Sequence, residues 1–319
     1  VAPYPPRGRI GVASQSGNFV SAFLNYASQT GIGISRSVSA GNAAATGLAD
    51  YLEWFADDPE TDVGLCYVEG LHDGRDFFER VQAITPRMPV VVVKGGRTSG
   101  GQRAAASHTG SLASDDRIFD GMARQAGMSR APSIEAAFDL AATFATQPLP
   151  AGNQVVVLTT AGGWGVVAAD AVTTHPSLEL APLPKDLLTA IDSMLPPRWS
   201  RNNPVDLAGG ETRDTIPELL DLVAGHHSVD AIIQLGLGIQ GNTAALTRGG
   251  PFYPDHGLRR IVEFHENQEN RYATAAVEAS TTHDKPVLVA SELAVARPDN
   301  PMVAAVRASG RLCYPSADR

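Results

Sequence analysis

The chain has 319 residues, 43% of them hydrophobic and 18% charged, which is the composition of a globular protein with room for two domains. Its 34 acidic residues outnumber the 25 basic ones and no run of Lys or Arg appears, so we expect no nucleic-acid partner. The apolar runs are too short to span a bilayer and the N-terminus has no signal-peptide pattern, which predicts no membrane segment and a cytoplasmic location.

The two cysteines, Cys66 and Cys313, lie far apart in apolar, strand-like runs. Such positions are typical of buried, reduced thiols, which agrees with a cytoplasmic protein. The chain starts at Val1 rather than at a methionine, and we therefore expect it to be a piece of a longer protein.

The first half of the chain alternates apolar strands with amphipathic helices. Strands are predicted over Gly8–Ser14, Ser35–Ala40, Val63–Val68 and Met88–Gly96, and helices over Asn18–Gln29, Leu48–Ala56, Asp76–Ile84 and Asp115–Ala126. Between the last strand and the last helix lies a stretch of small residues, RAAASHTGSLA (103–113), which we predict to be a loop. This alternation is typical of a parallel sheet with helices on both faces.

A linker of turn-forming residues, Gln147–Asn153, separates this half from a second half that repeats its order. A strand over Gln154–Thr160 leads into a glycine-rich turn, as at the start of the chain. Further on, SVDAIIQLGLG (228–238) matches TDVGLCYVEG (61–70), and DKPVLVASE (284–292) matches RMPVVVVKG (87–95). We therefore predict an α/β protein of two tandem, doubly wound, flavodoxin-like domains: residues 1–148 with the histidine loop, and residues 151–319 with a second glycine-rich helix start.

Two turns are predicted to present backbone N–H groups to an anion. SQSGN (14–18) and TTAGGWG (159–165) each end a strand and open a helix, where free N–H groups and the helix dipole attract negative charge. The candidate phosphate-binding residues are Ser16, Gly17 and Asn18 in the first turn, and Gly162, Gly163, Trp164 and Gly165 in the second. The alternative for each turn is an ordinary helix start, with glycine needed only for close packing of helix against strand.

The histidine of the small-residue stretch, His108, has neighbours too small to cover its ring. No His or Cys stands at the short spacing of a metal site, so no metal is predicted there. A neutral imidazole can attack a phosphoryl group and hold it as an N–P bond, provided that a carboxylate or carbonyl supports its other ring nitrogen. Glu69 is the candidate carboxylate, because it ends a strand and parallel strands end at one edge of a sheet. The alternatives are a surface histidine without function and an ordinary surface carboxylate.

Taken in order, these segments resemble one protein family. GRIGVASQSGNF, SAGN, DDPETDVGLCYVEGLHDGR, VVVVKGGRT, RAAASHTGSLAS, TTAGGWGVVAADA and NPVDL (203–207) look like the NDP-forming acyl-CoA synthetases, relatives of succinyl-CoA synthetase. The resemblance implies that His108 is transiently phosphorylated, that Glu69 supports it, and that both helix starts hold the phosphoryl group. The implied reaction is acyl-CoA + ADP or GDP + phosphate ⇌ acid + CoA + ATP or GTP, through acyl phosphate and phosphohistidine.

The resemblance also implies CoA, a nucleotide, phosphate and a small-molecule acid as ligands. We find no CoA-binding and no ATP-grasp segment in the sequence, and expect both on the same full-length chain or on a partner subunit. We expect Mg²⁺ only at the nucleotide-binding domain, and the isolated chain to be inactive. Acidic residues are missing after SAGN, and Trp164 stands where relatives often have proline; both departures concern substrate fit.

Two other functions remain as alternatives at this point. The first is a non-catalytic regulatory or scaffold module of the same fold that senses acyl-CoA or nucleotide. The second, a flavin-binding protein of the flavodoxin type, is disfavoured by the low aromatic content of 6% and by the short first turn. The acyl group, the choice of adenine or guanine, and assembly into a homo-oligomer are left open, as is the role of residues 240–280.

Overall fold

The computed structural model describes residues 3–43, 45–109, 115–209 and 213–318, with the backbone alone for 105–109. The chain forms two compact units, Val1–Thr146 and Gln147–Arg319, and each is described by itself.

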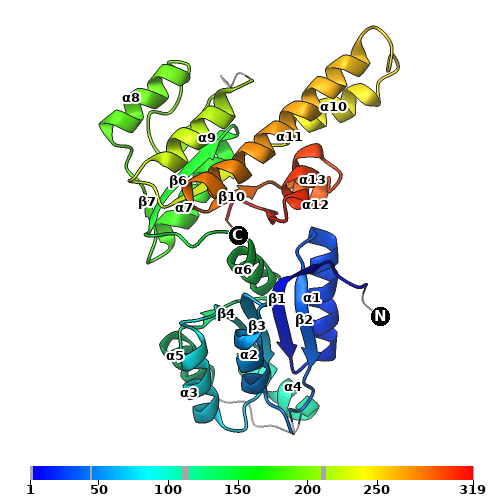
Figure 1. The fold of residues 1–319 in the computed structure, drawn as a ribbon, viewed down its shortest axis with the longest axis vertical. Helices are drawn as coiled ribbons and strands as arrows, with labels where there is room; N and C mark the ends of the chain where they lie inside the picture. Colours follow the sequence, from blue (N-terminus) through cyan, green and yellow to red (C-terminus); the bar gives the residue numbers. More distant parts are fainter. Residues whose placement is uncertain (1–2, 44, 110–114, 210–212, 319) are drawn as a thin grey trace. The chain divides into compact units, whose positions relative to one another are not determined.

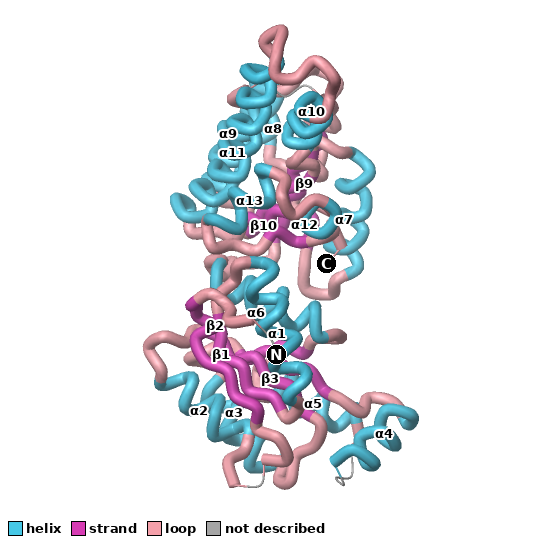
Figure 2. Tube along the Cα trace, turned by 90° about the vertical axis from the view of Figure 1, so that its right-hand side faces the viewer, coloured by secondary structure: helices cyan, strands magenta, loops and turns pink. Residues whose placement is uncertain are grey.

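The first unit is built on a five-stranded, parallel sheet with the strand order β2-β1-β3-β4-β5 (Figure 1). Its elements are β1 (Arg7–Ser14), α1 (Gly17–Thr30), β2 (Ile34–Ser39), α2 (Leu48–Asp57), β3 (Val63–Val68), α3 (Gly74–Ile84), β4 (Val90–Lys94), α4 (Ser99–Thr109), α5 (Asp116–Gln125), β5 (Ser129–Arg130) and α6 (Ile134–Thr146). Helices α2, α3 and α5 cover one face, while α1 and α6 pack on the other (Figure 2). Strands β3 and β4 are therefore buried along their whole length, as their continuous apolar runs indicate.

The second unit contains a six-stranded, parallel sheet with the order β11-β10-β9-β6-β7, and β8 pairs with β6 beyond the end of β7. Its elements are β6 (Gln154–Thr159), α7 (Gly162–Thr174), β7 (Glu179–Leu180), α8 (Lys185–Met194), β8 (Val205–Asp206), α9 (Thr215–Gly225), β9 (Ala231–Leu235), α10 (Ile239–Arg248), α11 (Leu258–His283), β10 (Val287–Ala290), α12 (Leu293–Ala296), α13 (Pro301–Ala308) and β11 (Cys313–Tyr314).

The two sheets have the same strand order, which confirms the prediction of two tandem doubly wound units. β6, β9, β10 and β11 take the places of β1, β3, β4 and β5, and the pair β7 and β8 takes the place of β2. The strands matched by sequence, β3 with β9 and β4 with β10, thus occupy equivalent positions. This is the flavodoxin-like order, in which ligands bind beyond the carboxyl ends of the strands.

The stretch that contains His108 differs from the prediction. It was predicted to be a loop, but the chain is helical through Thr109 in α4. Gln102, Arg103 and the alanines that follow are good helix formers, and this propensity explains the helix. The side chain of His108 lies outside the described residues.

Residues 240–280, which the sequence left unexplained, form most of an antiparallel pair of helices, α10 and α11, that extends away from its sheet (Figure 1). The carboxylate of Glu269, in α11, accepts hydrogen bonds from the N–H groups of Gly238, Gln240 and Gly241 at the start of α10. Burial raises the pKa of Glu269 in spite of these bonds. The N–H groups at the start of α10 thus have a hydrogen-bond acceptor within the protein.

Cys66 and Cys313 are buried free thiols, as predicted, and burial raises the pKa of each to about 12. In the part of the chain that the structure describes, no helix is both long and apolar enough to cross a membrane.

Candidate functional site

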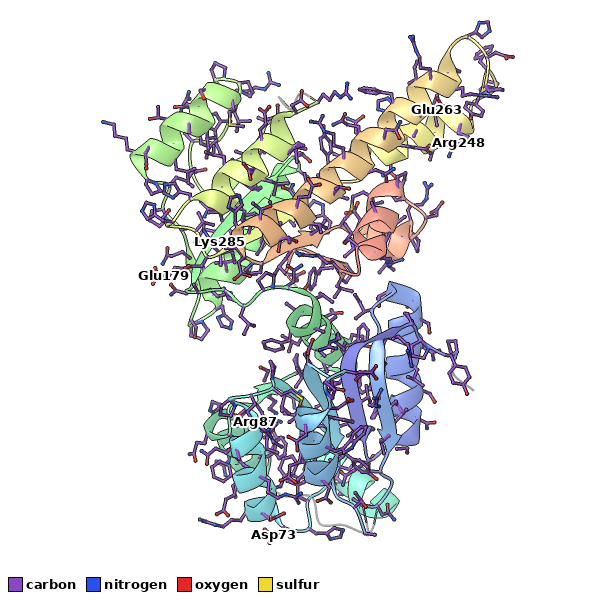
Figure 3. All side chains as sticks on the ribbon, viewed as in Figure 1. Asp73, Arg87, Glu179, Arg248, Glu263 and Lys285 are labelled. Carbon is purple, nitrogen blue, oxygen red and sulfur yellow. The ribbon has the colours of Figure 1, made fainter. Side chains whose placement is uncertain are left out.

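The predicted site residues of the first unit follow the carboxyl ends of its strands. In Figure 3, Asp73, which follows β3, is labelled at the lower end of this unit, and Arg87, which precedes β4, is labelled at about its mid-height. In the second unit, Glu179 and Lys285 lie at the amino ends of strands β7 and β10 (Figure 3). Arg248 and Glu263 lie on the α10–α11 pair.

At the first helix start, the buried hydroxyl of Ser14 holds the turn. It donates to the carbonyl oxygen of Ser16 over 2.8 Å and accepts from the N–H of the same residue over 3.0 Å. Ser16 is the N-cap of α1 and its side chain makes no capping bond. The first helical hydrogen bond comes from the N–H of Val20, so the N–H groups of Gly17 and Asn18 precede it, and both residues are exposed.

The second helix start is built in the same way. The hydroxyl of Thr159 donates to the carbonyl oxygen of Ala161 over 2.8 Å and accepts from its N–H over 2.9 Å. Ala161 is the N-cap of α7, again without a side-chain cap. Gly162 and Gly163 follow and are exposed, and a side chain at Gly163 would meet open space. A Cβ at Gly162, however, would stand 2.6 Å from a carboxylate oxygen of Asp206, so a negative charge lies beside the second helix start. The first helix start leaves room for an anion at its first two N–H groups.

Two of the four residues predicted in the second turn have another role. The N–H groups of Trp164 and Gly165 donate to the carbonyl oxygen of Ala161, over 3.0 and 3.3 Å, so they serve the helix itself. A Cβ at Gly165 would lie 2.9 Å from Thr159 and 3.4 Å from Pro204. Gly165 thus permits the close packing of helix against strand, which was the alternative role given for glycine in this turn.

Glu69 directly follows β3, and its backbone is fixed from two sides. The side-chain oxygen of Gln15, which follows β1, accepts from the N–H groups of Glu69 and Gly70, and its NH₂ group donates to the carbonyl oxygen of Gly70 over 2.9 Å. The ammonium of Lys94, at the end of β4, donates to the carbonyl oxygens of Glu69, over 3.0 Å, and Gly95. Three strand ends thereby hold the backbone of the candidate carboxylate.

The Tyr67 hydroxyl, from the same strand, and the Glu69 side chain both lie beside Gly95, where an added Cβ would stand 2.5 Å from the hydroxyl oxygen and 3.7 Å from Cγ of Glu69. Burial and the charge of Glu69 raise the pKa of Tyr67 to about 12, so the phenol stays a donor near neutral pH. The Tyr67 ring contacts Phe19, in the first turn of α1, edge-on at 4.3 Å between centroids. Sequence patterns did not single out this tyrosine.

Lys94, at the end of β4, is only 2% exposed, and burial lowers the pKa of its ammonium. The ring of Phe119 lies 5.8 Å from its nitrogen. The ammonium of Lys94 contacts backbone carbonyl oxygens that the fold brings to it. No local sequence signal indicates these contacts.

The structure places the backbone of His108 in α4, near the end of that helix. Because its side chain is not described, the approach of its ring to Glu69 stays a prediction. In the described residues, no group of three or more His, Cys, Asp or Glu side chains is arranged to hold a metal ion.

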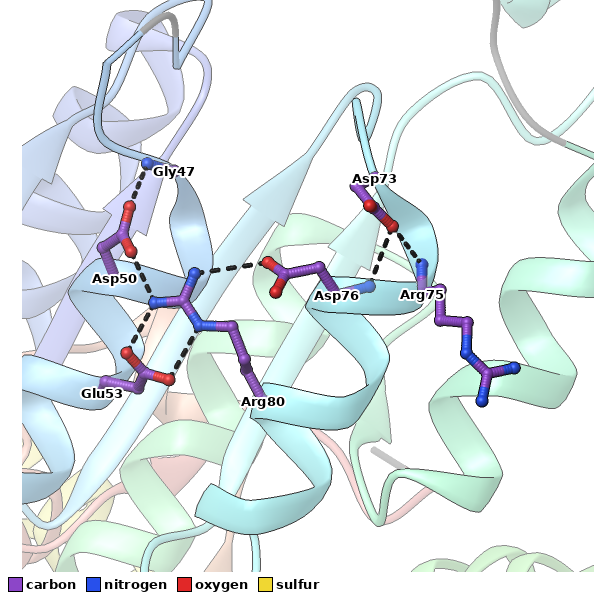
Figure 4. A network of polar contacts seen from close by, with 7 residues as sticks. All are labelled: Gly47, Asp50, Glu53, Asp73, Arg75, Asp76 and Arg80. Carbon is purple, nitrogen blue, oxygen red and sulfur yellow. Dashed lines mark hydrogen bonds and ion pairs between the residues drawn. The ribbon is translucent and has the colours of Figure 1, made fainter.

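A small pocket of about 200 Å³ lies beyond β1 and β3, where the strand order reverses, and Gln15, Gly47 and Gly70 are among its lining residues. Arg80 is its cation, but the carboxylates of Asp50, Glu53 and Asp76 all bind that guanidinium (Figure 4). The charge of Arg80 is therefore already compensated, and the pocket does not resemble a phosphate site. Asp73, beside it in Figure 4, caps the start of α3.

Comparison with known proteins matches both units. Residues 7–144 match the succinyl-CoA ligase like flavodoxin domain and residues 155–239 the Ligase-CoA domain. An ADP-forming acetate–CoA ligase of Methanocaldococcus jannaschii is 38% identical over 209 residues, 66% of this chain and 29% of that protein. The alpha subunit of an ADP-forming acetate–CoA ligase I of Pyrococcus furiosus is 41% identical over 202 residues, 63% of this chain and 43% of that subunit.

Among solved structures, the dinucleotide-forming acetyl-coenzyme A synthetase 1 of Ca. Korarchaeum cryptofilum, in complex with phosphate and ADP, superimposes with a TM-score of 0.77 at 29% identity. The match covers 97% of this chain and 65% of that one. The fold is that of the tandem flavodoxin-like core of acid–CoA ligases. The chain carries the succinyl-CoA ligase like flavodoxin domain and the Ligase-CoA domain, and it spans 29% and 43% of the length of the two curated relatives above.

Proposed function

We propose that this chain is the phosphohistidine-carrying core of an NDP-forming acid–CoA ligase. That enzyme would convert acyl-CoA, ADP or GDP, and phosphate into the acid, CoA, and ATP or GTP. The observation that carries the proposal is the matched pair of uncapped helix starts, at Gly17 and Gly162, each held by a buried hydroxyl. Two helix starts held in the same way suit a phosphoryl group that is passed between two stations.

In this proposal, His108 carries the phosphoryl group and Glu69 supports its ring. The N–H groups of Gly17 and Asn18 hold the phosphoryl oxygens at one station, and those of Gly162 and Gly163 hold them at the other. The first domain, residues 1–148, thus supplies the histidine and one helix start, and the second, residues 151–319, supplies the other helix start.

CoA and the nucleotide would be bound by the family's CoA-binding and ATP-grasp domains, on the same full-length chain or on a partner subunit. The P. furiosus relative named as an alpha subunit supports the second arrangement. Mg²⁺ would belong to the nucleotide-binding domain, and a small-molecule acid would be the substrate. The two buried free thiols support a reducing, cytoplasmic location.

The test is phosphorylation of the full-length protein with γ-labelled ATP. We expect a label on this chain that is stable to alkali and lost in acid, as a phosphohistidine is, and we expect His108→Asn to remove it. His72→Asn, in an exposed residue of the same unit, is the matched control and should keep the label. A label that persists in His108→Asn would overturn the proposal, and no label in the wild type would favour the regulatory module.

A further inference from the structure

A groove lies between helices α3 and α5, which are side by side on one face of the first sheet (Figure 1). Its volume is about 570 Å³, which is within the range of small-molecule binding sites. The side chains that define it are Leu71, Arg75, Phe78, Arg117, Ile118 and Met122. None of them was a predicted site residue, and none belongs to either helix start.

The apolar lining of the groove is anchored in the core of the first unit. Phe119 also lines the groove and is only 2% exposed. Leu71, Phe78 and Met122 are half-buried and pack against the same buried cluster. Ile118 adds an exposed apolar side chain at the start of α5. The groove therefore offers a fixed apolar surface, which an apolar ligand would remove from water.

The charged side chains that line the groove are Arg75 and Arg117, and no carboxylate of the described residues is among them. Arg75 forms an exposed ion pair with Glu79 over 2.8 Å, and Arg117 forms one with Asp115 over 3.4 Å. Exposed pairs of this kind contribute little, and each uses a single nitrogen of its guanidinium. The Arg75 side chain also points away from the Arg80 network (Figure 4). Both arginines therefore keep N–H groups with which to bind an anion.

Gly121 leaves the groove open on the side of α5. It lies in the interior of this helix, where glycine is unfavourable. A Cβ added there would meet no atom within 4 Å, so packing within the described residues does not require glycine. The same is true of Gly74, the first residue of α3, which lines the opposite wall. Two glycines that no neighbour requires, on facing walls, indicate a space that is kept for a ligand.

We infer that the groove between α3 and α5 binds a small carboxylic acid with an apolar body. The apolar body lies against Phe78, Phe119 and Met122, and the carboxylate binds Arg75 and Arg117, because the planar guanidinium matches a carboxylate in shape and charge. In a protein of net charge −9, two arginines without a carboxylate between them favour an anion at this place. The inference goes beyond the proposed function and is independent of it, since it involves neither His108 nor the helix starts.

The first test follows Met122 by NMR in the full-length protein labelled with ¹³C at the methionine methyl groups. The Met122 signal, assigned by its loss in Met122→Leu, should move on titration with octanoate and reach saturation. Met128, which is buried in the same unit and does not line the groove, gives the reference signal. Acetate lacks the apolar body and octan-1-ol lacks the charge, so each should bind about tenfold more weakly or worse. An unmoved Met122 signal, or equal binding of octan-1-ol, would overturn the inference.

The second test removes the charge. The double change Arg75→Gln and Arg117→Gln should weaken octanoate binding about tenfold, the effect of losing a hydrogen bond between charged groups. Arg124→Gln, in an exposed arginine of α5 that does not line the groove, is the matched control and should bind octanoate within about twofold of the wild type. Unchanged binding in the double variant, or an equal loss in the control, would overturn the inference.

The third test fills the groove from within. Gly121→Leu should raise the midpoint of urea unfolding, because leucine is the better helix former, and should weaken octanoate binding about tenfold. The two effects have opposite signs, whereas a variant that merely damaged the fold would lower both stability and binding. A lower midpoint would show that the fold itself requires Gly121, and undiminished binding would show that the acid lies elsewhere; either result would contradict the role given to this glycine.

Discussion

In the second unit, strand β6 is paired along one edge by two short strands, β7 and β8, with a gap between them. The side chain of Asn203 fills this gap. Its oxygen accepts from the N–H of Val157 over 3.0 Å, and its NH₂ group donates to the carbonyl oxygens of Val155, over 2.8 Å, and Ala181, over 3.0 Å. The side-chain amide therefore makes the hydrogen bonds that a continuous edge strand would make there, because it offers both an acceptor and two donors.

We expect Asn203→Ala to lower the free energy of unfolding by about 2–4 kcal/mol, since it leaves three backbone groups of the sheet region without these partners. The change is measured by urea unfolding, as a shift in the midpoint concentration of urea with an unchanged dependence of the unfolding free energy on urea. Asn203→Asp keeps the acceptor and loses both donors, so it should also destabilise. Asn202→Ala, at an exposed neighbour, should change stability by less than about 0.5 kcal/mol; an equal effect at both positions would refute the role given to Asn203.

Helices α2 and α3 are joined by Arg80, which binds Asp50 and Glu53 of α2 and Asp76 of its own helix (Figure 4). The guanidinium lowers the pKa of both Asp50 and Glu53. A carboxylate whose pKa is lowered by folding stabilises the folded state above its unfolded pKa of about 4, and this contribution is lost as the pH falls through the folded pKa. The junction of α2 and α3 should therefore weaken in acid.

We expect Arg80→Met to lower the melting temperature by about 3 °C at pH 7, because a partly exposed network contributes on the order of 1 kcal/mol in a domain of this size. The difference from the wild type should shrink as the pH falls from 7 to 3. Thermal melts across this range test it. Arg87→Met, which removes a single exposed pair with Asp57, should have a smaller effect, and an offset for Arg80→Met that does not vary with pH would contradict the expectation.

The order of strands and helices in each unit could be predicted from the sequence because it depends on local patterns: apolar runs, helical spacing and glycine turns. The edge on which Glu69 lies followed from the parallel topology alone. The contacts that hold its backbone, from Gln15 and Lys94, could not be predicted, because they come from residues that follow or end other strands. A buried lysine has the same sequence signature as a solvated one until the carbonyl oxygens around it are known.

The second helix start shows the same limit. Four residues of its turn were equivalent as a sequence motif, but in the fold Gly162 and Gly163 are exposed, whereas the N–H groups of Trp164 and Gly165 bond within the helix. In α4, helix propensity prevailed where small residues around His108 had indicated a loop. Motif and composition thus singled out the two helix starts, and backbone geometry decided which of their N–H groups bond within the helix.

At the scale of the whole molecule, each unit has a buried cluster of its own in the described residues. The first unit's cluster contains side chains such as Leu52, and the second unit's contains side chains such as Ile191. Since each unit buries a cluster of its own, we expect two unfolding transitions rather than one. Trp54 reports on the first unit, whereas Trp164 and Trp199 report on the second.

Leu52→Ala should lower the stability of the first unit by about 3 kcal/mol and leave the second transition in place, and Ile191→Ala should do the reverse. Fluorescence-monitored urea unfolding measures this, with Trp54→Phe to observe the second unit alone and the double change Trp164→Phe and Trp199→Phe to observe the first. If the transition seen by the first unit's tryptophan and the one seen by the second unit's tryptophans shift together in either variant, the two units unfold as one cooperative body. Separate shifts would mean that each helix start is held by a core of its own, so that one helix start can loosen without the other.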